Sequence, residues 1–191
     1  MSAPQMAGLL LLNPEMIFLV LLSGLVCLLC SLTRRRRGRA SLRRHRRYQA
    51  TAARVLDRLP QLAGEGQRLN YLRRINPYVF EALLLLALTR QGLRVVRNAS
   101  YSADGGLDGQ VWIAGERYLI QAKRYRRAIT PAHVADFTRL LARERCAGLF
   151  IHTGRSGEKS WQHSRAAGAL HIISGQRLLA LLAGEPDWLP R

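Results

Sequence analysis

The sequence predicts an α/β fold, a mixed central sheet sandwiched by helices, preceded by a single transmembrane helix. Three observations predict it. Residues 16–32 carry no charged side chain, which is typical of a membrane span. Residues 108–123 contain two short strands around a turn, as in a hairpin. After residue 130, helical patterns alternate with apolar strand patterns, which favours parallel pairing within the same sheet.

Size and charge restrict the class of protein. The 191 residues suit one globular domain with additions, and 30 Lys and Arg against 12 Asp and Glu give a formal net charge of +18. Nearly all the basic residues are Arg, whose planar guanidinium suits a polyanionic partner. The three cysteines are too few for a disulfide framework and fit a reducing compartment without structural zinc. We interpret Cys27 and Cys30 as packing residues rather than as a redox pair.

The predicted span begins with a helix start signal. Asn13 is a capping residue, Pro14 suits the first helical position, and Glu15 places an acid in the first turn. A helix over residues 14–33 is about 30 Å long, which matches a bilayer core. The alternatives are a buried helix of a soluble protein and a cleaved signal peptide. The signal peptide is disfavoured because no basic residue precedes the apolar run.

Nine arginines follow between residues 34 and 47. By the positive-inside rule they place the N-terminus outside and the rest of the chain in the cytoplasm, which predicts a single-pass protein of the inner (cytoplasmic) membrane. The arginines also suit anionic headgroups, so membrane lipids are expected partners. Contact with a nucleic acid is the alternative role of this cluster and is compatible with the first.

The remaining elements follow in order. Residues 40–59 predict a helix with a weak apolar face, and residues 60–66 predict a linker. Asn76 and Pro77 start the next helix, which ends at Gly92. We then expect strands over 93–97, 108–113 and 118–123, a helix over 131–144, a strand over 147–152, a helix that Ser156 caps and that ends near Gly168, a strand over 170–173, and a helix over 175–182.

Asp108 and the segment Gln121-Ala122-Lys123 form the most informative pair of motifs. Residues two apart on a strand share a face, so Gln121 and Lys123 point one way while Ala122 points into the core. If the two strands form a hairpin, Asp108 comes alongside Gln121. One carboxylate, one amide oxygen and one ammonium then surround a point that suits a hard cation such as Mg²⁺ next to a phosphate. Each motif alone is also common as a turn or as a solvated strand end.

The chemistry that this set predicts is hydrolysis of a phosphodiester, in which a metal ion polarises the phosphoryl group. Asp108, Gln121 and Glu81 are the expected metal ligands, with Mg²⁺ as the cofactor and Mn²⁺ as a substitute. Lys123 either orients the attacking water or stabilises charge in the transition state. The groups expected to contact flanking phosphates are the backbone at Gly105 and Gly106 and the side chains of Arg124, Arg126 and Arg127.

Five stretches occur in a fixed order: Phe80-Glu81, Asp104-Gly105-Gly106-Leu107-Asp108, Gln121-Ala122-Lys123-Arg124-Tyr125, residues 148–154 and residues 173–178. Together they resemble the Mrr-like restriction endonuclease domain, a branch of the PD-(D/E)xK nuclease superfamily, over about residues 76–182. The resemblance implies a restriction-endonuclease-like core and Mg²⁺-dependent DNA cleavage. It implies Asp108, Gln121 and Lys123 as the catalytic core and Glu81 as the helix acid. Ser174 stands where this family frequently has an Asp.

The expected organisation follows from the span and the resemblance. It consists of a short N-terminal tail over 1–13, a transmembrane helix over 14–33, a basic juxtamembrane collar and linker helix over 34–69, an Mrr-like nuclease domain over 70–185 and a C-terminal tail over 186–191. The separate DNA-reading domain of well-known members is expected to be absent, which leaves the sequence or methylation specificity open.

The predicted function is a membrane-anchored, metal-dependent DNA endonuclease of restriction type. The alternative is a non-catalytic, membrane-tethered DNA-binding protein of a DNA-transfer or defence system. A weaker alternative is a nuclease that acts on RNA or single strands. DNA and membrane lipids are the expected partners, with no small-molecule cofactor, and a homodimer is plausible because double-strand cuts need two sites.

Overall fold

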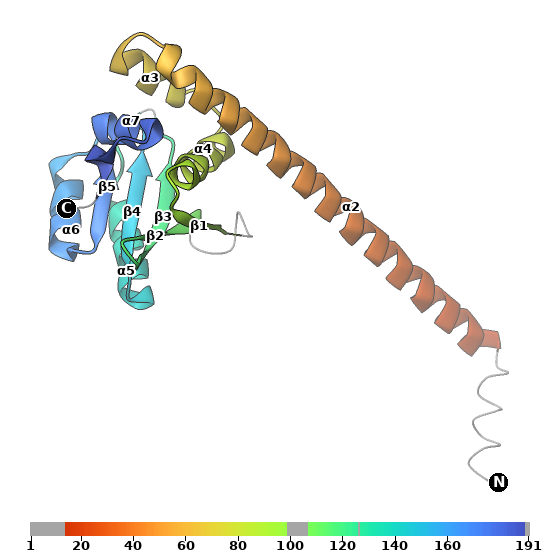
Figure 1. Cartoon of the computed structure of the whole chain (residues 1–191). Coiled ribbons are helices and arrows are strands. Elements are labelled where there is room, and N and C mark those ends of the chain that lie inside the picture. Colours follow the sequence, from red (N-terminus) through yellow and green to blue (C-terminus); the bar gives the residue numbers. More distant parts are fainter. Residues whose placement is uncertain (1–13, 99–106, 126, 190–191) are drawn as a thin grey trace. The chain divides into compact units, whose positions relative to one another are not determined.

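The chain divides into two units, residues 1–46 and residues 47–191, and each is described by itself. The computed structural model describes residues 14–98, 107–125 and 127–189 (Figure 1). The second unit contains a five-stranded sheet with helices packed against it. The predicted α/β arrangement with a mixed sheet is therefore confirmed.

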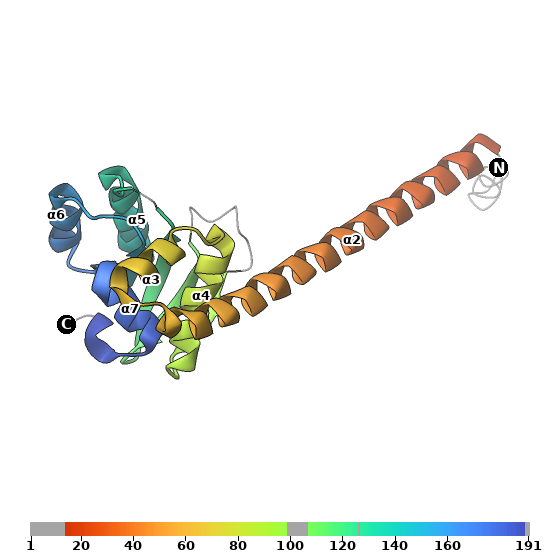
Figure 2. The same cartoon turned by 90° about the horizontal axis from the view of Figure 1, so that it is seen from above.

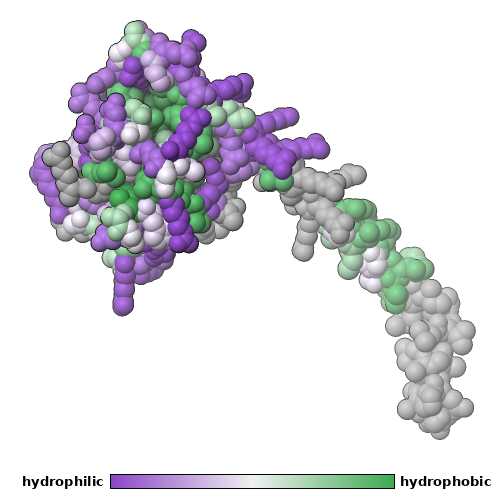
Figure 3. Space-filling view, in the orientation of Figure 1, coloured by the Kyte–Doolittle hydropathy of each residue, from purple (hydrophilic) through white to green (hydrophobic). Residues whose placement is uncertain are grey.

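The helix α2 (Pro14–Arg58) supplies the described part of the first unit. The predicted helix over 14–33 does not end there but continues through the arginine-rich stretch, because Arg, Ala and Leu favour helix and no proline interrupts them. Large apolar side chains between Phe18 and Leu32 are exposed, and Figure 3 shows them as a green segment. Among the described residues, no helix is long and apolar enough to cross a membrane, so the predicted transmembrane helix is not supported.

The sheet is mixed, with the strand order β1-β2-β3-β4-β5. The first three strands pair antiparallel, and the last three pair parallel. The parallel pair β3 and β4 confirms the crossover that the sequence predicts. The strands are β1 (Arg94–Arg97), β2 (Gly109–Ile113), β3 (Glu116–Lys123), β4 (Ala147–His152) and β5 (Leu170–Ile173).

The hairpin between β2 and β3 closes through a two-residue turn, which is shorter than the predicted segment over 114–117. Ala114 and Gly115 both have positive φ, 50° and 85°, and the last pair of the ladder is Ile113 with Glu116. Two successive residues with positive φ match the twist of antiparallel strands, so this turn fixes the register of the hairpin. That register determines which residue of β3 lies beside Asp108.

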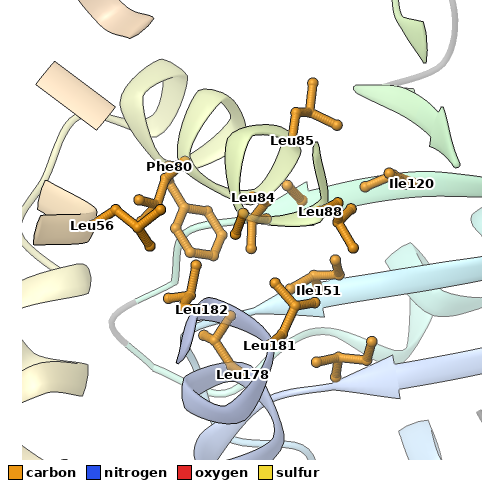
Figure 4. Close-up of a cluster of buried hydrophobic side chains, with 14 of the residues drawn as sticks. Leu56, Phe80, Leu84, Leu85, Leu88, Ile120, Ile151, Leu178, Leu181 and Leu182 are labelled. Carbon is orange, nitrogen blue, oxygen red and sulfur yellow. The ribbon is translucent and has the colours of Figure 1, made fainter. Parts of the chain in front are cut away.

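Helices cover both faces of the sheet (Figure 2). One face carries α4 (Pro77–Arg90) and α7 (Gly175–Ala183), and the other carries α5 (Pro131–Glu144) and α6 (Glu158–Ala167). Because α4 is apolar around most of its circumference, it needs cover on its outer side as well. Figure 4 shows Phe80 and Leu84 of this helix among side chains from the sheet, α7 and α2.

The outer cover of α4 comes from the end of α2, which the sequence assigns to the collar and linker helix. Ala52, Val55, Leu56 and Leu59 are at most 7% exposed and belong to the same core cluster as α4. Two short helices that the sequence does not predict follow, η1 (Leu59–Gln61) and α3 (Gly64–Leu72). Residues 47–59 are therefore part of the folded domain.

The end of the chain also packs on the core. The 3-10 turn η2 (Pro186–Trp188) lies in the segment assigned to a C-terminal tail, yet Trp188 is 1% exposed. Its Nε1 donates to Gln91 Oε1 at 2.9 Å, and Gln91 Nε2 donates to the Leu181 carbonyl at 2.8 Å. Gln91 thus joins α4, α7 and η2.

Candidate active site

Asp108 lies directly before β2, where the hairpin register brings it beside β3. Its amide donates to the Ile120 carbonyl at 2.9 Å, and its Oδ2 accepts a hydrogen bond from the Ala122 amide at 2.6 Å. The side chain thus takes a place on the β3 backbone that a main-chain carbonyl would fill in a regular ladder. Asp108 therefore lies alongside Gln121 and Ala122, as the hairpin hypothesis requires.

Asn98 holds the backbone of Asp108 from the opposite side. Its Nδ2 donates to the Leu107 carbonyl at 3.1 Å, and its amide donates to the Asp108 carbonyl at 3.4 Å. Sequence reasoning missed this residue. Asn98 could have been found from its position, because it directly follows β1 and lies opposite the start of β2.

Lys123 is the last residue of β3, Gln121 lies two residues before it, and their side chains are on the same face of the strand. Ala122, between them, is 6% exposed and belongs to the core cluster under α4, so its neighbours point to the other face of the sheet. Gln121 is also 6% exposed, whereas Lys123 is half-buried. In parallel register, Lys123 pairs with His152, the last residue of β4.

Glu81 is half-buried on α4 and interacts electrostatically with the strand residues. Burial, and then the charge of Asp108, raise the pKa of Glu81 to about 7, while Lys123 and Arg97 oppose this shift. Burial raises the pKa of Asp108 to about 6, against the Ala122 hydrogen bond and the charge of Lys123. The structure therefore brings Glu81, Asp108 and Lys123 within electrostatic reach of one another.

The residues expected to bind phosphates differ in their exposure. The Arg124 guanidinium donates to the Arg73 carbonyl at 2.5 Å, and its buried Nε has no hydrogen-bond partner among the described residues, so this side chain is engaged inside the fold. Arg127 is exposed. Gly105, Gly106 and Arg126 lie outside the described residues.

His152 is a buried polar group that sequence reasoning left without a role. It is 0% exposed, and burial lowers its pKa to about 4, so its imidazole is neutral at physiological pH. Its Nε2 lies 2.9 Å from Ser156 Oγ. Ser156 therefore does not cap α6 as predicted. Gly157 occupies the N-cap position there without a side-chain cap.

The arrangement can support a divalent cation, although no group of three or more Asp, Glu, His or Cys side chains forms a complete cation site among the described residues. Two carboxyl groups with raised pKa values lie within electrostatic reach of each other, and a cation bound there would favour their charged forms. A cavity of about 690 Å³ at the other ends of β3 and β4, lined by Arg117 and Cys146, contains none of these residues. We therefore place the candidate site at the ends of the strands that carry Asp108 and Lys123.

A mixed sheet with an acid, an amide and a lysine on two adjoining strands defines the class of restriction-endonuclease-like proteins. Within this class, residues 72–182 match the family of Mrr catalytic domains, described as restriction endonucleases, and the chain belongs to this family. No curated protein and no solved structure matches the chain. The family identifies a nuclease domain of restriction type, an endonuclease hydrolase, with DNA as the implied substrate.

Proposed function

We propose that this protein is a metal-dependent DNA endonuclease that hydrolyses phosphodiester bonds. The observation that carries the proposal is the Asp108 carboxylate, which is held on the Ala122 amide at 2.6 Å and lies within electrostatic reach of Glu81 and Lys123. A protein that only binds DNA gains nothing from two carboxylates at its contact surface, because they repel phosphates. In a catalytic site the same carboxylates would bind the divalent cation that the reaction needs.

The residues fit a divalent cation such as Mg²⁺, with Mn²⁺ as a substitute. Asp108 and Glu81 would hold it, since carboxylate oxygens are the hard donors that such cations prefer. The side chain of Gln121, the third expected ligand, points to the face of the sheet opposite α4, the helix that carries Glu81. The raised pKa values of the two carboxyl groups support this assignment, because burial is their main cause and a cation would offset the penalty that burial places on the charged forms. When bound, the cation polarises the phosphoryl group and lowers the pKa of an attacking water.

The protein's own groups orient the reaction. Lys123 places a positive charge where negative charge develops on the phosphoryl oxygens. The hydrogen bond to Ala122 keeps the Asp108 carboxylate against the same strand, and Asn98 holds its backbone. His152 pairs with Lys123 in the sheet and remains neutral, so it adds no competing charge.

Plasmid cleavage by the full chain tests the proposal. We expect nicking with Mg²⁺ or Mn²⁺ and none with EDTA. Lys123→Ala and Asp108→Ala should each slow cleavage by about 100-fold or more. Arg143→Ala, an exposed site on α5, is the matched control and should cleave normally. DNA binding that is identical in all four proteins, with no cleavage under any metal, would instead support the non-catalytic alternative.

We also propose that the protein acts at the cytoplasmic membrane, with the N-terminus outside and the nuclease domain in the cytoplasm. The support is the set of exposed apolar side chains between Phe18 and Leu32, followed by nine arginines up to Arg47. Fractionation should recover the chain with membranes. Resistance to high salt and carbonate would indicate insertion, whereas release by salt would indicate headgroup contact alone. Recovery in the soluble fraction would refute both.

A cytoplasm-active reporter fused after Arg191 tests the orientation, because it should be active only if the nuclease domain faces the cytoplasm.

A second copy of the chain is a further proposed partner, since cutting both strands requires two sites. Linear product that rises with the square of protein concentration would support a dimer, whereas nicked circles alone would favour action by monomers.

A further inference from the structure

The ends of β3 and β4 continue to pair beyond the sheet. The Arg155 amide donates to the Arg127 carbonyl at 3.3 Å, and the Ile129 amide donates to the Arg155 carbonyl at 3.0 Å. These two bonds form a parallel bridge between Ala128 and Arg155. We call this short extension, residues 127–129 and 153–156, the strand-end ledge.

The ledge is tightly built, because its two backbones approach closely. A Cβ on Gly154 would lie 2.2 Å from the Arg127 carbonyl oxygen and 3.0 Å from Tyr125 Cβ, so no other residue fits without moving the chain. Thr153 Oγ1 donates to the Tyr125 carbonyl, and Arg73 Nε donates to the Thr153 carbonyl, both at 2.8 Å. The ledge is therefore fixed to the end of β3 and to the segment after α3.

The ledge presents one exposed arginine from each segment, Arg127 and Arg155. Among the described residues, neither guanidinium has a carboxylate within salt-bridge distance. Three exposed arginines of the same domain do have such partners, Arg90 with Asp57, Arg139 with Asp136 and Arg165 with Glu158, whereas the exposed Arg74 and Arg145 resemble the ledge pair in forming no salt bridge with a described residue. The two ledge arginines thus keep their full charge for an external anion.

The position of the ledge relative to Lys123 indicates which anion. Arg155 follows His152 by three residues, and His152 pairs with Lys123. Three residues of chain span at most about 11 Å. One strand of duplex DNA carries a phosphate about every 3.4 Å along the helix axis. Arg127 and Arg155 are therefore within reach of phosphates a few nucleotides from one that lies at Lys123.

We propose that Arg127 and Arg155 bind two backbone phosphates of duplex DNA and hold the strand next to the candidate active site. The identity of the phosphate at Lys123 rests on the proposed function, but binding at the ledge requires no cleavage. Arg155 is new to this site, and it comes from a loop that sequence patterns alone do not connect to Lys123.

The salt dependence of binding tests the proposal. The full chain in EDTA is titrated with a short DNA duplex at several salt concentrations. Each lost phosphate contact lowers the slope of log K against log salt by about 0.9, so Arg127→Ala and Arg155→Ala should each show this loss and the double variant about twice as much. Arg143→Ala removes the same charge from an exposed site on α5 and should keep the wild-type slope.

Thermal midpoints equal to that of the wild type confirm that the variants are folded. Wild-type slopes in both folded single variants would overturn the proposal, as would an equal loss in the Arg143→Ala control. A loss seen with single-stranded RNA but not with duplex DNA would also overturn it. Reduced slopes without metal-dependent cleavage would support the ledge and refute the nuclease, whereas cleavage with unchanged slopes would do the reverse.

Discussion

At the scale of single residues, Glu81 and Asp108 determine the electrostatics of the site. Burial raises the pKa of both groups, to about 7 and about 6. An acid with a raised pKa in the folded state binds more protons folded than unfolded. The free energy of unfolding therefore falls as pH rises from the unfolded pKa, about 4, through the folded values.

Replacing Glu81 should change this pH dependence in metal-free protein. With EDTA present, we expect wild-type stability to fall between about pH 4.5 and pH 7, and Glu81→Gln to flatten that fall. At pH 8 the variant should be more stable by on the order of 1 kcal/mol, after allowance for solvent screening. Denaturant unfolding at pH 5 and pH 8 measures this, with the exposed Glu185→Gln as the control. An equally steep fall in Glu81→Gln would contradict the prediction.

Metal binding should stabilise the folded protein against heat, and this effect can be measured without an activity assay. At pH 8 and a Mg²⁺ concentration ten times its dissociation constant, we expect the Tm to rise by about 3–6 °C. Asp108→Asn removes a charged ligand and should lose most of this rise. Thermal scans with and without Mg²⁺ provide the measurement. An equal rise in both proteins would show that the cation binds elsewhere.

At the scale of elements, the strand-end ledge depends on a glycine that no larger residue can replace. Gly154→Ala places a methyl group against the Arg127 carbonyl, and we expect a loss of about 1–3 kcal/mol because the two segments must separate. Gly66→Ala, inside α3, is the control. A Cβ there meets nothing within 4 Å and Ala favours helix over Gly, so this variant should lose no stability. Equal unfolding midpoints for the two variants would contradict this account.

Local sequence patterns were sufficient to predict most strands of the sheet and most of its helices. The features that they did not predict depend on contacts between residues far apart in the chain. The alternation around Ala122 predicts the shared face of Gln121 and Lys123, since that periodicity is a property of any strand. The pairing of Ser156 with His152 overrides a capping preference, because a buried imidazole needs a partner. No local pattern indicates that Arg124 reaches Arg73, since 51 residues separate them.

At the scale of the whole molecule, the unit that contains the sheet begins at Arg47, so it includes part of the expected collar and linker helix over 34–69. A fragment over residues 60–191 lacks Val55, Leu56 and Leu59 and exposes the outer side of α4. Each buried aliphatic side chain contributes about 1.5–3 kcal/mol, so the loss of three approaches the whole stability of a typical domain. We expect residues 47–191 to unfold cooperatively and residues 60–191 to aggregate or remain largely unfolded. A similar Tm for both fragments, measured by circular dichroism, would refute this.

The burial of Trp188 gives the chain an internal optical reporter. An indole in a dry, apolar environment emits at shorter wavelengths than one in water, and Trp188 is 1% exposed with its Nε1 bonded to Gln91. Trp112, stacked under the Arg94 guanidinium, and Trp161 lie in half-buried positions. The shift of emission to longer wavelengths on unfolding therefore includes the release of η2 from the end of α4. Release of that contact can be timed in unlabelled protein.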